Sequence, residues 1–350
     1  MTYLDYQATT PLAPEAFDAM LPWLRDQHAN PHSAHRAGRA AKATVEVARD
    51  QVAALLPAGG RIAFTSGATE ALNWAIKGGR GAIVTIATEH AAVLDTVAAS
   101  GREVTVLPVG NDGLVDPEIP AGSGLVAAML VNNEIGVQQP IAELARAAKA
   151  AGALLLCDAV QGYGRVAVPD GCDLIAISAH KVYGPKGIGA LWVREGVELG
   201  ALLHGGGQEA LGRSGTLSPA LCAGFGVAAR LLKERADIDR QHVETLWSAA
   251  TARLNGWTIN GSVEQRYHGN LNIRRDGLDV ARLMSDLRDI AFSAGSACAS
   301  GSGRPSHVLR AIGLTDAQAR SSIRLGFGRY TTEMELIEAV EGIDAAARSQ

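Results

Sequence analysis

Short apolar runs alternate with stretches of helical periodicity along the first two thirds of the chain. One helix is marked at both ends, because Pro140 suits a first turn, apolar residues follow at spacings of three and four, and Gly152 suits a stop. This alternation predicts an α/β fold built on a mainly parallel sheet. The predicted strands of that sheet cover residues 61–64, 82–86, 125–131, 153–157 and 174–178.

The pattern changes beyond about Lys233. A long, charged helical stretch follows, and after it come short predicted strands around Ile259, 271–273 and 323–325, mixed with helices. We therefore predict a second, smaller domain. The predicted division gives a large domain over residues 16–235 and a small domain over residues 236–350, to which residues 1–15 add an N-terminal arm.

Composition and charge narrow the class of protein. The chain has 350 residues, of which 47% are hydrophobic, and a formal net charge of -4. A large core is expected, and no basic stripe is present that could neutralise a nucleic-acid backbone. The first eleven residues lack an apolar signal core, and no window approaches the roughly 18 uncharged apolar residues that a membrane span needs. We expect a cytoplasmic protein with neither a nucleic-acid nor a membrane partner.

Neither the cysteines nor the histidines indicate a metal site. The four cysteines form no C-x-x-C pair, which argues against a zinc site and against a disulfide framework. His28, His32 and His35 lie close in sequence, but Pro31 interrupts any helix that would bring them onto one face. No resident metal is expected.

An anion site is indicated where the first predicted strand ends. Residues 64–70 read Phe-Thr-Ser-Gly-Ala-Thr-Glu, so a helix starts directly after the strand and presents unpaired backbone N–H groups. An ordinary capped helix start explains the same residues equally well. Nucleotides are disfavoured, because neither G-x-x-x-x-G-K-[ST] nor G-x-G-x-x-G accompanies the segment.

Three more segments follow predicted strands, where the ligands of a parallel sheet bind. Asp158 follows residues 153–157 and could hold a pyridinium N–H, or cap a helix. Lys181 follows residues 174–178 and could form an imine; Lys186 competes with it, although a lysine in a Gly/Pro turn is more often a solvated charge. A lone histidine such as His90 is more often structural.

Together these segments resemble the class V aminotransferase fold of pyridoxal 5'-phosphate (PLP) enzymes and, within it, the NifS/IscS-type cysteine desulfurases, over nearly the whole chain. The resemblance implies the aspartate aminotransferase-like PLP transferase fold (fold type I), with a large, mainly parallel-sheet domain and a smaller α+β domain. It identifies Lys181 as the lysine that binds PLP covalently and Asp158 as the partner of the pyridine nitrogen. It implies that Gln161 donates a hydrogen bond to the phenolic oxygen of PLP and that His90 stacks on the PLP ring.

The resemblance also assigns the phosphate and the partner subunit. Asn133, in the segment 131–136, matches a family asparagine near cofactor and substrate. The run 204–209 and the following Arg-Ser-Gly-Thr match a family segment whose threonine, here Thr216, reaches the phosphate of the neighbouring subunit, so a homodimer is implied. The residues that the resemblance assigns to the phosphate within the chain are Ala68, Thr69, Ser178 and His180.

Cys298 is the candidate nucleophile. Cys157 lies in an apolar strand and Cys222 in a helical pattern, both typical of small core residues, whereas Cys172 is less clear. Cys298 instead lies in a Gly/Ser-rich run, residues 293–306, whose composition is typical of an exposed loop with an accessible thiol. The residues alone favour a chance surface cysteine, but the resemblance identifies the segment as the longer, IscS-like cysteine loop.

The implied reaction converts L-cysteine to L-alanine. Lys181 would act as anchor and base, His90 would move protons, and the Cys298 thiolate would take the substrate's sulfur as a persulfide. Arg324 would bind the substrate carboxylate through a bidentate fork, with Arg329 as the competitor for that role. The sulfur would pass to an acceptor protein, such as an iron–sulfur scaffold or a component of tRNA or cofactor thiolation, and Cys298 is a candidate iron–sulfur ligand during transfer.

Departures from the family pattern leave some points open. The N-terminal segment 3–11 keeps the family outline but varies at its middle positions, and Gly326 stands where a serine is common after the carboxylate arginine. The chain stops at Gln350, whereas longer members continue with a segment that docks the scaffold protein. Another class V enzyme, such as a selenocysteine lyase or an aminotransferase, and a PLP-binding partner subunit are the alternatives.

Overall fold

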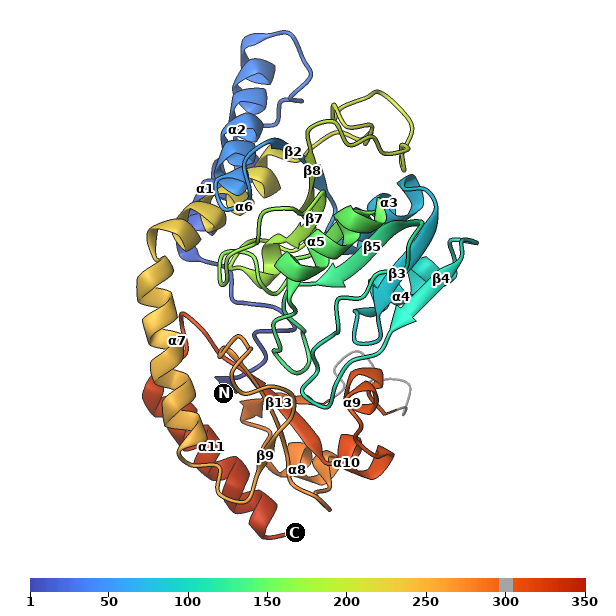
Figure 1. Ribbon diagram of the computed structural model, residues 1–350. Coiled ribbons are helices and arrows are strands. Elements are labelled where there is room, and N and C mark those ends of the chain that lie inside the picture. The colour runs from blue at the N-terminus through green and yellow to red at the C-terminus, as the bar shows by residue number, and fades with distance from the viewer. Residues whose placement is uncertain (296–304) are drawn as a thin grey trace.

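The computed structural model describes residues 1–295 and 305–350, and its largest element is a seven-stranded sheet in the order β2-β8-β7-β6-β5-β3-β4 (Figure 1). Neighbouring strands from β7 to β4 are parallel, and only β8 runs antiparallel to both of its neighbours. The strands are β2 (Gly60–Thr65), β3 (Ala82–Ile86), β4 (Val104–Leu107), β5 (Ser123–Met129), β6 (Leu154–Asp158), β7 (Leu174–Ser178) and β8 (Gly189–Arg194).

Both faces of this sheet are buried, because apolar side chains alternate along each central strand. In β7, Ile175 and Ile177 join the core on one face, while Leu174 and Ala176 join the core on the other. Helices α3 (Ala68–Gly78) and α4 (Ala91–Ala98) cover the second face. The first face packs against α1 (Pro14–Arg25), α2 (Arg36–Ala53), α5 (Ile141–Ala151) and α6 (Pro219–Glu234).

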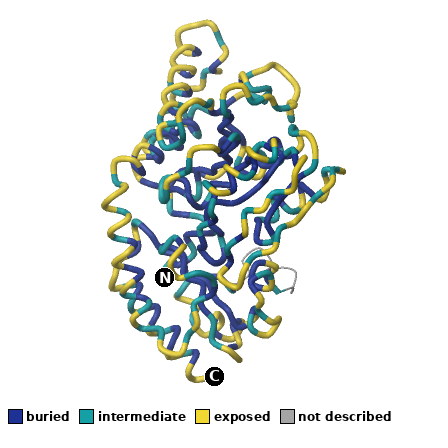
Figure 2. Tube along the Cα trace, in the orientation of Figure 1, coloured by how far each residue is buried: buried dark blue, intermediate teal, exposed yellow. Residues whose placement is uncertain are grey.

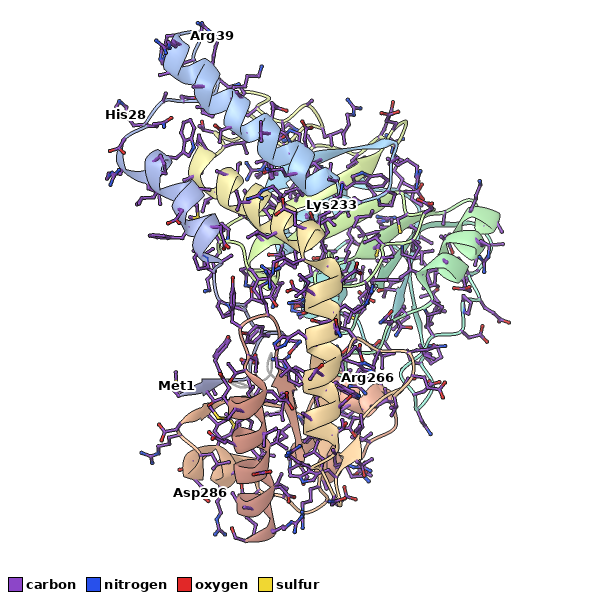
Figure 3. The ribbon with its side chains drawn as sticks, turned by 90° about the vertical axis from the view of Figure 1, so that its left-hand side faces the viewer. Met1, His28, Arg39, Lys233, Arg266 and Asp286 are labelled. Carbon is purple, nitrogen blue, oxygen red and sulfur yellow. The ribbon has the colours of Figure 1, made fainter. Side chains whose placement is uncertain are left out.

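A separate hydrophobic core lies around a four-stranded antiparallel sheet in the order β12-β13-β10-β9. The first strand of the chain, β1 (Thr2–Tyr3), pairs with β11 (Ile290–Ala291) beside this sheet, so the N-terminus lies among C-terminal elements (Figures 1 and 3). The other elements here are β9 (Thr258–Ile259), β10 (Asn270–Arg274), β12 (Ser293–Ala294), β13 (Ser322–Gly326), α7 (Ala236–Thr251), α8 (Val280–Asp286), α9 (His307–Ala311), α10 (Asp316–Arg320) and α11 (Glu333–Arg348).

The predicted strands of the large sheet are all present, and the mainly parallel sheet is confirmed. The helix between Pro140 and Gly152 is confirmed as well, with Gly152 in the left-handed conformation (φ 77°) that ends it. Cys157 and Cys222 lie in the core as predicted, and Cys172 is buried too. The division into residues 16–235 and the remainder stays a prediction.

The buried part of the chain follows the two sheets, whereas the outer faces of the helices are exposed (Figure 2). His28 lies at the outer end of the α1–α2 pair, far from the small sheet (Figure 3). Within residues 1–295 and 305–350, no helix is both long enough and apolar enough to cross a membrane.

Candidate active site

A cavity of about 590 Å³ opens at the carboxyl ends of β5, β6 and β7. This is the edge at which an open parallel sheet binds its ligands. The cavity brings together ten of the residues predicted from the sequence, namely Ala68, Thr69, His90, Asn133, Asp158, Gln161, Ser178, His180, Lys181 and Arg324. Lys186 also lines it.

Two predicted site residues are not among those that line the cavity. Thr216 is exposed and does not belong to the described lining of this chain's own cavity. Cys298 lies outside the described residues.

The predicted anion site forms the wall at the start of α3. Gly67 precedes the helix in an extended conformation, and no side chain of the described residues caps the first turn, so its backbone N–H groups remain available to an anion. Strand β8 approaches closely here, because a Cβ on Gly189 would lie 2.8 Å from the Gly67 Cα. The backbone here is therefore suited to cradle an anion such as a phosphate.

Asp158, the last residue of β6, lies on the cavity floor. Its Oδ1 accepts a hydrogen bond from the Val160 N–H at 3.0 Å. Burial raises the pKa of its carboxyl, whereas that N–H and the nearby His90 and Lys181 lower it. A cationic N–H in the cavity would meet the ionised form, so the site suits a protonated pyridine nitrogen.

His90 directly precedes α4 and caps it, since its Nδ1 accepts the Ala92 N–H at 3.0 Å. Burial lowers the pKa of the imidazole, against the opposing effect of Asp158. The ring is therefore neutral at neutral pH. Because Nδ1 accepts a hydrogen bond, the proton of the neutral ring lies on Nε2, where it can be given to or taken back from a ligand.

Lys181 lies in a short turn of 3-10 helix, residues Ala179–Lys181, that follows β7. Its Nζ donates to the carbonyl oxygens of Gln7 at 2.6 Å and Ala8 at 2.9 Å. Gln161 Nε2 donates to the same Gln7 oxygen at 2.9 Å. The N-terminal segment thus holds the amine from outside the large sheet. Lys186, the sequence competitor, is exposed on the following turn.

His180 lies beside Lys181 and contacts the same N-terminal segment. Its Nδ1 lies 3.2 Å from Thr9 Oγ1, and its carbonyl oxygen accepts from Thr9 and Thr10. Burial, and then the positive charges of Lys181 and Lys186, lower the pKa of His180 to about 4. The ring is therefore neutral at neutral pH and available for hydrogen bonding.

The two arginines predicted as alternatives have different surroundings. Arg324, on β13, lines the cavity, and it donates to Asp5 Oδ1 at 2.7 Å and to the Asn133 carbonyl at 2.9 Å. Arg329 donates to Asp239 Oδ2 at 2.6 Å and packs over the Tyr183 ring at 4.2 Å. It is not among the described residues that line the cavity. Only Arg324 is therefore placed to meet a small ligand there.

Sequence reasoning missed the part that the N-terminal segment plays. Gln7, Ala8 and Thr9 line the cavity, and two of them bind Lys181 through backbone carbonyls. A carbonyl carries no residue signature, so only the family outline of the segment 3–11 could have pointed to it.

A family model and curated relatives both match nearly the whole chain. The family model described as aminotransferase class-V matches residues 2–339. The curated cysteine desulfurase IscS of Rickettsia bellii is 42% identical over a stretch that covers 97% of this chain and 89% of the relative. The relative from Rickettsia rickettsii is equally similar, at 42% identity over 97% of this chain and 89% of its own length.

Solved structures resemble the chain over nearly its whole length. A NifS-like protein of Rickettsia africae superposes with a TM-score of 0.91 at 30% identity and covers 99% of each chain. A structure described as SspA in complex with cysteine superposes with a TM-score of 0.84 at 33% identity, covering 95% of this chain and 100% of its own.

Proposed function

The chain belongs to the class V aminotransferase family, and from this membership we propose that it is a PLP-dependent cysteine desulfurase that converts L-cysteine to L-alanine. The family resemblance and the fold class predicted from the sequence are confirmed. One observation carries the proposal, which is the convergence of the phosphate cradle, Asp158, His90, Lys181 and Arg324 on one cavity.

The residues of the cavity fit PLP. We propose that Asp158 binds the ring nitrogen, His90 the ring face, Gln161 the phenolic oxygen and Lys181 the aldehyde carbon, with Asn133 beside ring and substrate. When bound, PLP supplies an electron-withdrawing ring that stabilises negative charge at the substrate's α-carbon. The proposed phosphate ligands are Ala68, Thr69, Ser178 and His180.

The chain's own groups perform the remaining work. Arg324 is buried, and its guanidinium is held by Asp5, Ser293 and the Asn133 carbonyl, so its positive charge is fixed in orientation where the carboxylate of cysteine would bind. The Lys181 amine lies at the same cavity and would remove the α-proton. His90, neutral with its proton on Nε2, would supply and recover a proton as the carbon–sulfur bond breaks.

We propose that Cys298 receives the sulfur. Its thiolate attacks the substrate's sulfur, a sulfur–sulfur bond forms, and the carbon–sulfur bond breaks with its electron pair left on carbon, which a proton then converts to alanine's methyl group. The persulfide would pass to an acceptor protein, such as an iron–sulfur scaffold or a thiolation component.

The residues on both sides of the segment 296–304 support this role for Cys298. On one side, the Gly295 N–H donates to the Ser322 carbonyl at 2.8 Å, beside the strand of Arg324. On the other, Ser306 Oγ donates to the buried Glu134 and a His307 ring nitrogen lies 2.9 Å from the Glu89 carbonyl. Both flanks of the cysteine segment are thus attached within two residues of the lining residues His90, Asn133 and Arg324.

The assembly that we propose is a cytoplasmic homodimer. Thr216 is exposed and lies outside the described lining of its own cavity, as a residue that serves the partner's phosphate would. Its proposed role therefore requires two subunits.

Replacement of Cys298 tests the proposed function. Cys298→Ala should retain the yellow cofactor absorbance but lose alanine production from L-cysteine, because the cofactor residues remain and the sulfur acceptor is absent. Alanine and protein-bound sulfur are measured by amino-acid analysis and mass spectrometry. Cys222→Ala, in the core, is the matched control and should keep activity.

Two results would contradict the proposal. Undiminished sulfur removal by Cys298→Ala would exclude that thiol as the acceptor. Transfer of the amino group of cysteine to a 2-oxo acid, with no sulfur released, would identify an aminotransferase instead.

A further inference from the structure

The N-terminal arm, residues 4–10, connects the small sheet to Lys181. The Gly326 N–H donates to the Leu4 carbonyl at 2.7 Å, and the Tyr6 N–H donates to the Gly326 carbonyl at 3.3 Å. The arm therefore runs as an added strand along the end of β13, the strand that carries Arg324.

Two side chains fix the arm on β13. Asp5 pairs with Arg324, and two residues later Gln7 packs its amide against Gly326. Gln7 Nε2 donates to the Gly269 carbonyl at 2.8 Å, which orients the amide so that Oε1 faces Gly326. A Cβ placed on Gly326 would overlap that Oε1, and it would also lie 2.9 Å from the Tyr6 backbone nitrogen.

The Gln7 side chain is buried beside Gly326. It is only 2% exposed, and its Oε1 has no hydrogen-bond partner among the residues that the structure describes. Gly326 itself does not adopt a left-handed φ, so its backbone would accept an alanine. The absence of a side chain at position 326 therefore leaves room for the arm, chiefly for the Gln7 amide and also for the Tyr6 backbone nitrogen, and is not required by the strand's conformation.

The backbone of the same residue reaches the catalytic lysine. The Gln7 carbonyl accepts from Lys181 Nζ at 2.6 Å and from Gln161 Nε2 at 2.9 Å, and the Ala8 carbonyl accepts from Lys181 Nζ at 2.9 Å. A displacement of the Gln7 side chain would move the Gln7 carbonyl, which shares its Cα, and with it the adjoining Ala8 carbonyl.

We propose that Gln7 and Gly326 form a coupled positioning pair, in which the glycine admits the glutamine side chain and so holds the arm's carbonyls on the amine of Lys181. The consequence for turnover rests on the proposed desulfurase function; the contact itself does not. It also gives a reason for the glycine at a position where the family commonly has a serine, because any side chain at position 326 would meet the Gln7 amide.

A double-mutant cycle tests the pair. Gly326→Ala should lower kcat for L-cysteine about tenfold, since displacements of about an ångström at a reacting group carry effects of that size or larger. Gln7→Ala should cost less, and Gln7→Ala combined with Gly326→Ala should recover part of the lost activity, because the new methyl group no longer overlaps the glutamine and only its contact with the Tyr6 backbone nitrogen remains. Gly342→Ala, where the added Cβ meets only one atom at 3.9 Å, is the control glycine substitution and should match the wild type.

A second readout uses the cofactor-free protein and no turnover. At a fixed, mildly alkaline pH, an amine-reactive reagent should label Lys181 faster in Gly326→Ala than in the wild type, because loss of the two carbonyl acceptors destabilises the protonated amine. The exposed Lys149 is the internal reference, and peptide mass spectrometry gives the ratio of the two labels. In the combined variant that ratio should move back towards the wild-type value.

The two measurements separate the positioning role of Gln7 and Gly326 from the proposed function. If the combined variant remains as impaired as Gly326→Ala in both measurements, or if Gly326→Ala behaves like the wild type in both, the pair does not position Lys181. If the wild type shows no desulfurase activity, the proposed function fails, while the labelling ratio still decides the positioning role.

Discussion

Burial sets the charge of the ionisable side chains around the cavity. It raises the pKa of Glu89 and Asp158 and lowers the pKa of His90 and His180. The two histidines are thus kept neutral at neutral pH. A neutral imidazole can both donate and accept a proton, whereas a protonated one can only donate, so burial suits His90 to the two-way proton transfer proposed for it.

The depressed pKa of His180 makes stability depend on pH. In the unfolded chain this ring protonates near its ordinary pKa of 6.5, whereas in the folded protein it resists protonation down to about 4. The neutral ring thus stabilises the fold above pH 6.5, and this stabilisation is lost as the pH falls towards 4. His180→Gln removes the effect, so its free energy of unfolding should fall less over that range than that of the wild type.

Urea titrations of both cofactor-free proteins at several pH values measure this difference. The expected difference in slope is a fraction of the about 1.4 kcal/mol per pH unit available to a fully shifted group, because solvent reaches part of the His180 ring. Parallel curves for the two proteins would show that His180 titrates normally in the fold.

At the scale of elements, the cradle depends on the approach of β8 to the junction of β2 and α3. Gly189 begins β8 and pairs with Ser178 of β7 and Thr65 of β2. A Cβ on Gly189 would lie 2.5 Å from the Ile177 carbonyl oxygen and 2.8 Å from the Gly67 Cα. Gly189→Ala should therefore displace the start of α3 and weaken PLP binding about tenfold, a loss of about 1.4 kcal/mol.

Equilibrium titration of the cofactor-free protein with PLP, followed by absorbance, measures that affinity. Gly152→Ala is the control, because this glycine ends α5 with φ 77° and meets no atom within 4 Å. The control should lose about 1 kcal/mol of stability to backbone strain but keep its affinity for PLP. Equal PLP affinity in Gly189→Ala and the wild type would place the phosphate elsewhere.

The elements that the sequence predicted best are those whose environment is uniform. Strands β5, β6 and β7 are buried on both faces, so their unbroken apolar runs stand out. The antiparallel direction of β8 could not be predicted from such a run, because a buried strand has the same apolar pattern whether its neighbours are parallel or antiparallel to it. The site residues after these strands were predictable from their positions, whereas Gln7 acts from more than 150 residues away in sequence from Gln161 and Lys181.

On the scale of the whole molecule, Tyr183 joins the core of the large sheet to the C-terminal segment. This residue has a positive φ of 65°, and its hydroxyl accepts the Arg329 N–H at 3.0 Å. The Arg329 guanidinium packs over the Tyr183 ring and pairs with Asp239 of α7. Arg329 therefore joins the C-terminal segment, the long helix and the turn after Lys181.

Lysine keeps the positive charge of arginine but lacks its planar fork. The same substitution at the two competing arginines should therefore affect stability in one case and substrate binding in the other. Arg329→Lys should lose about 1 kcal/mol of stability through weaker contacts with Asp239 and Tyr183, and it should keep its KM for L-cysteine. Arg324→Lys should raise KM about tenfold or more, because a bidentate grip on the substrate carboxylate is lost. Thermal unfolding and steady-state kinetics on both variants separate the two effects. A raised KM in Arg329→Lys, with Arg324→Lys unaffected, would transfer the carboxylate site to Arg329 and require the turn around Tyr183 to open towards the cavity.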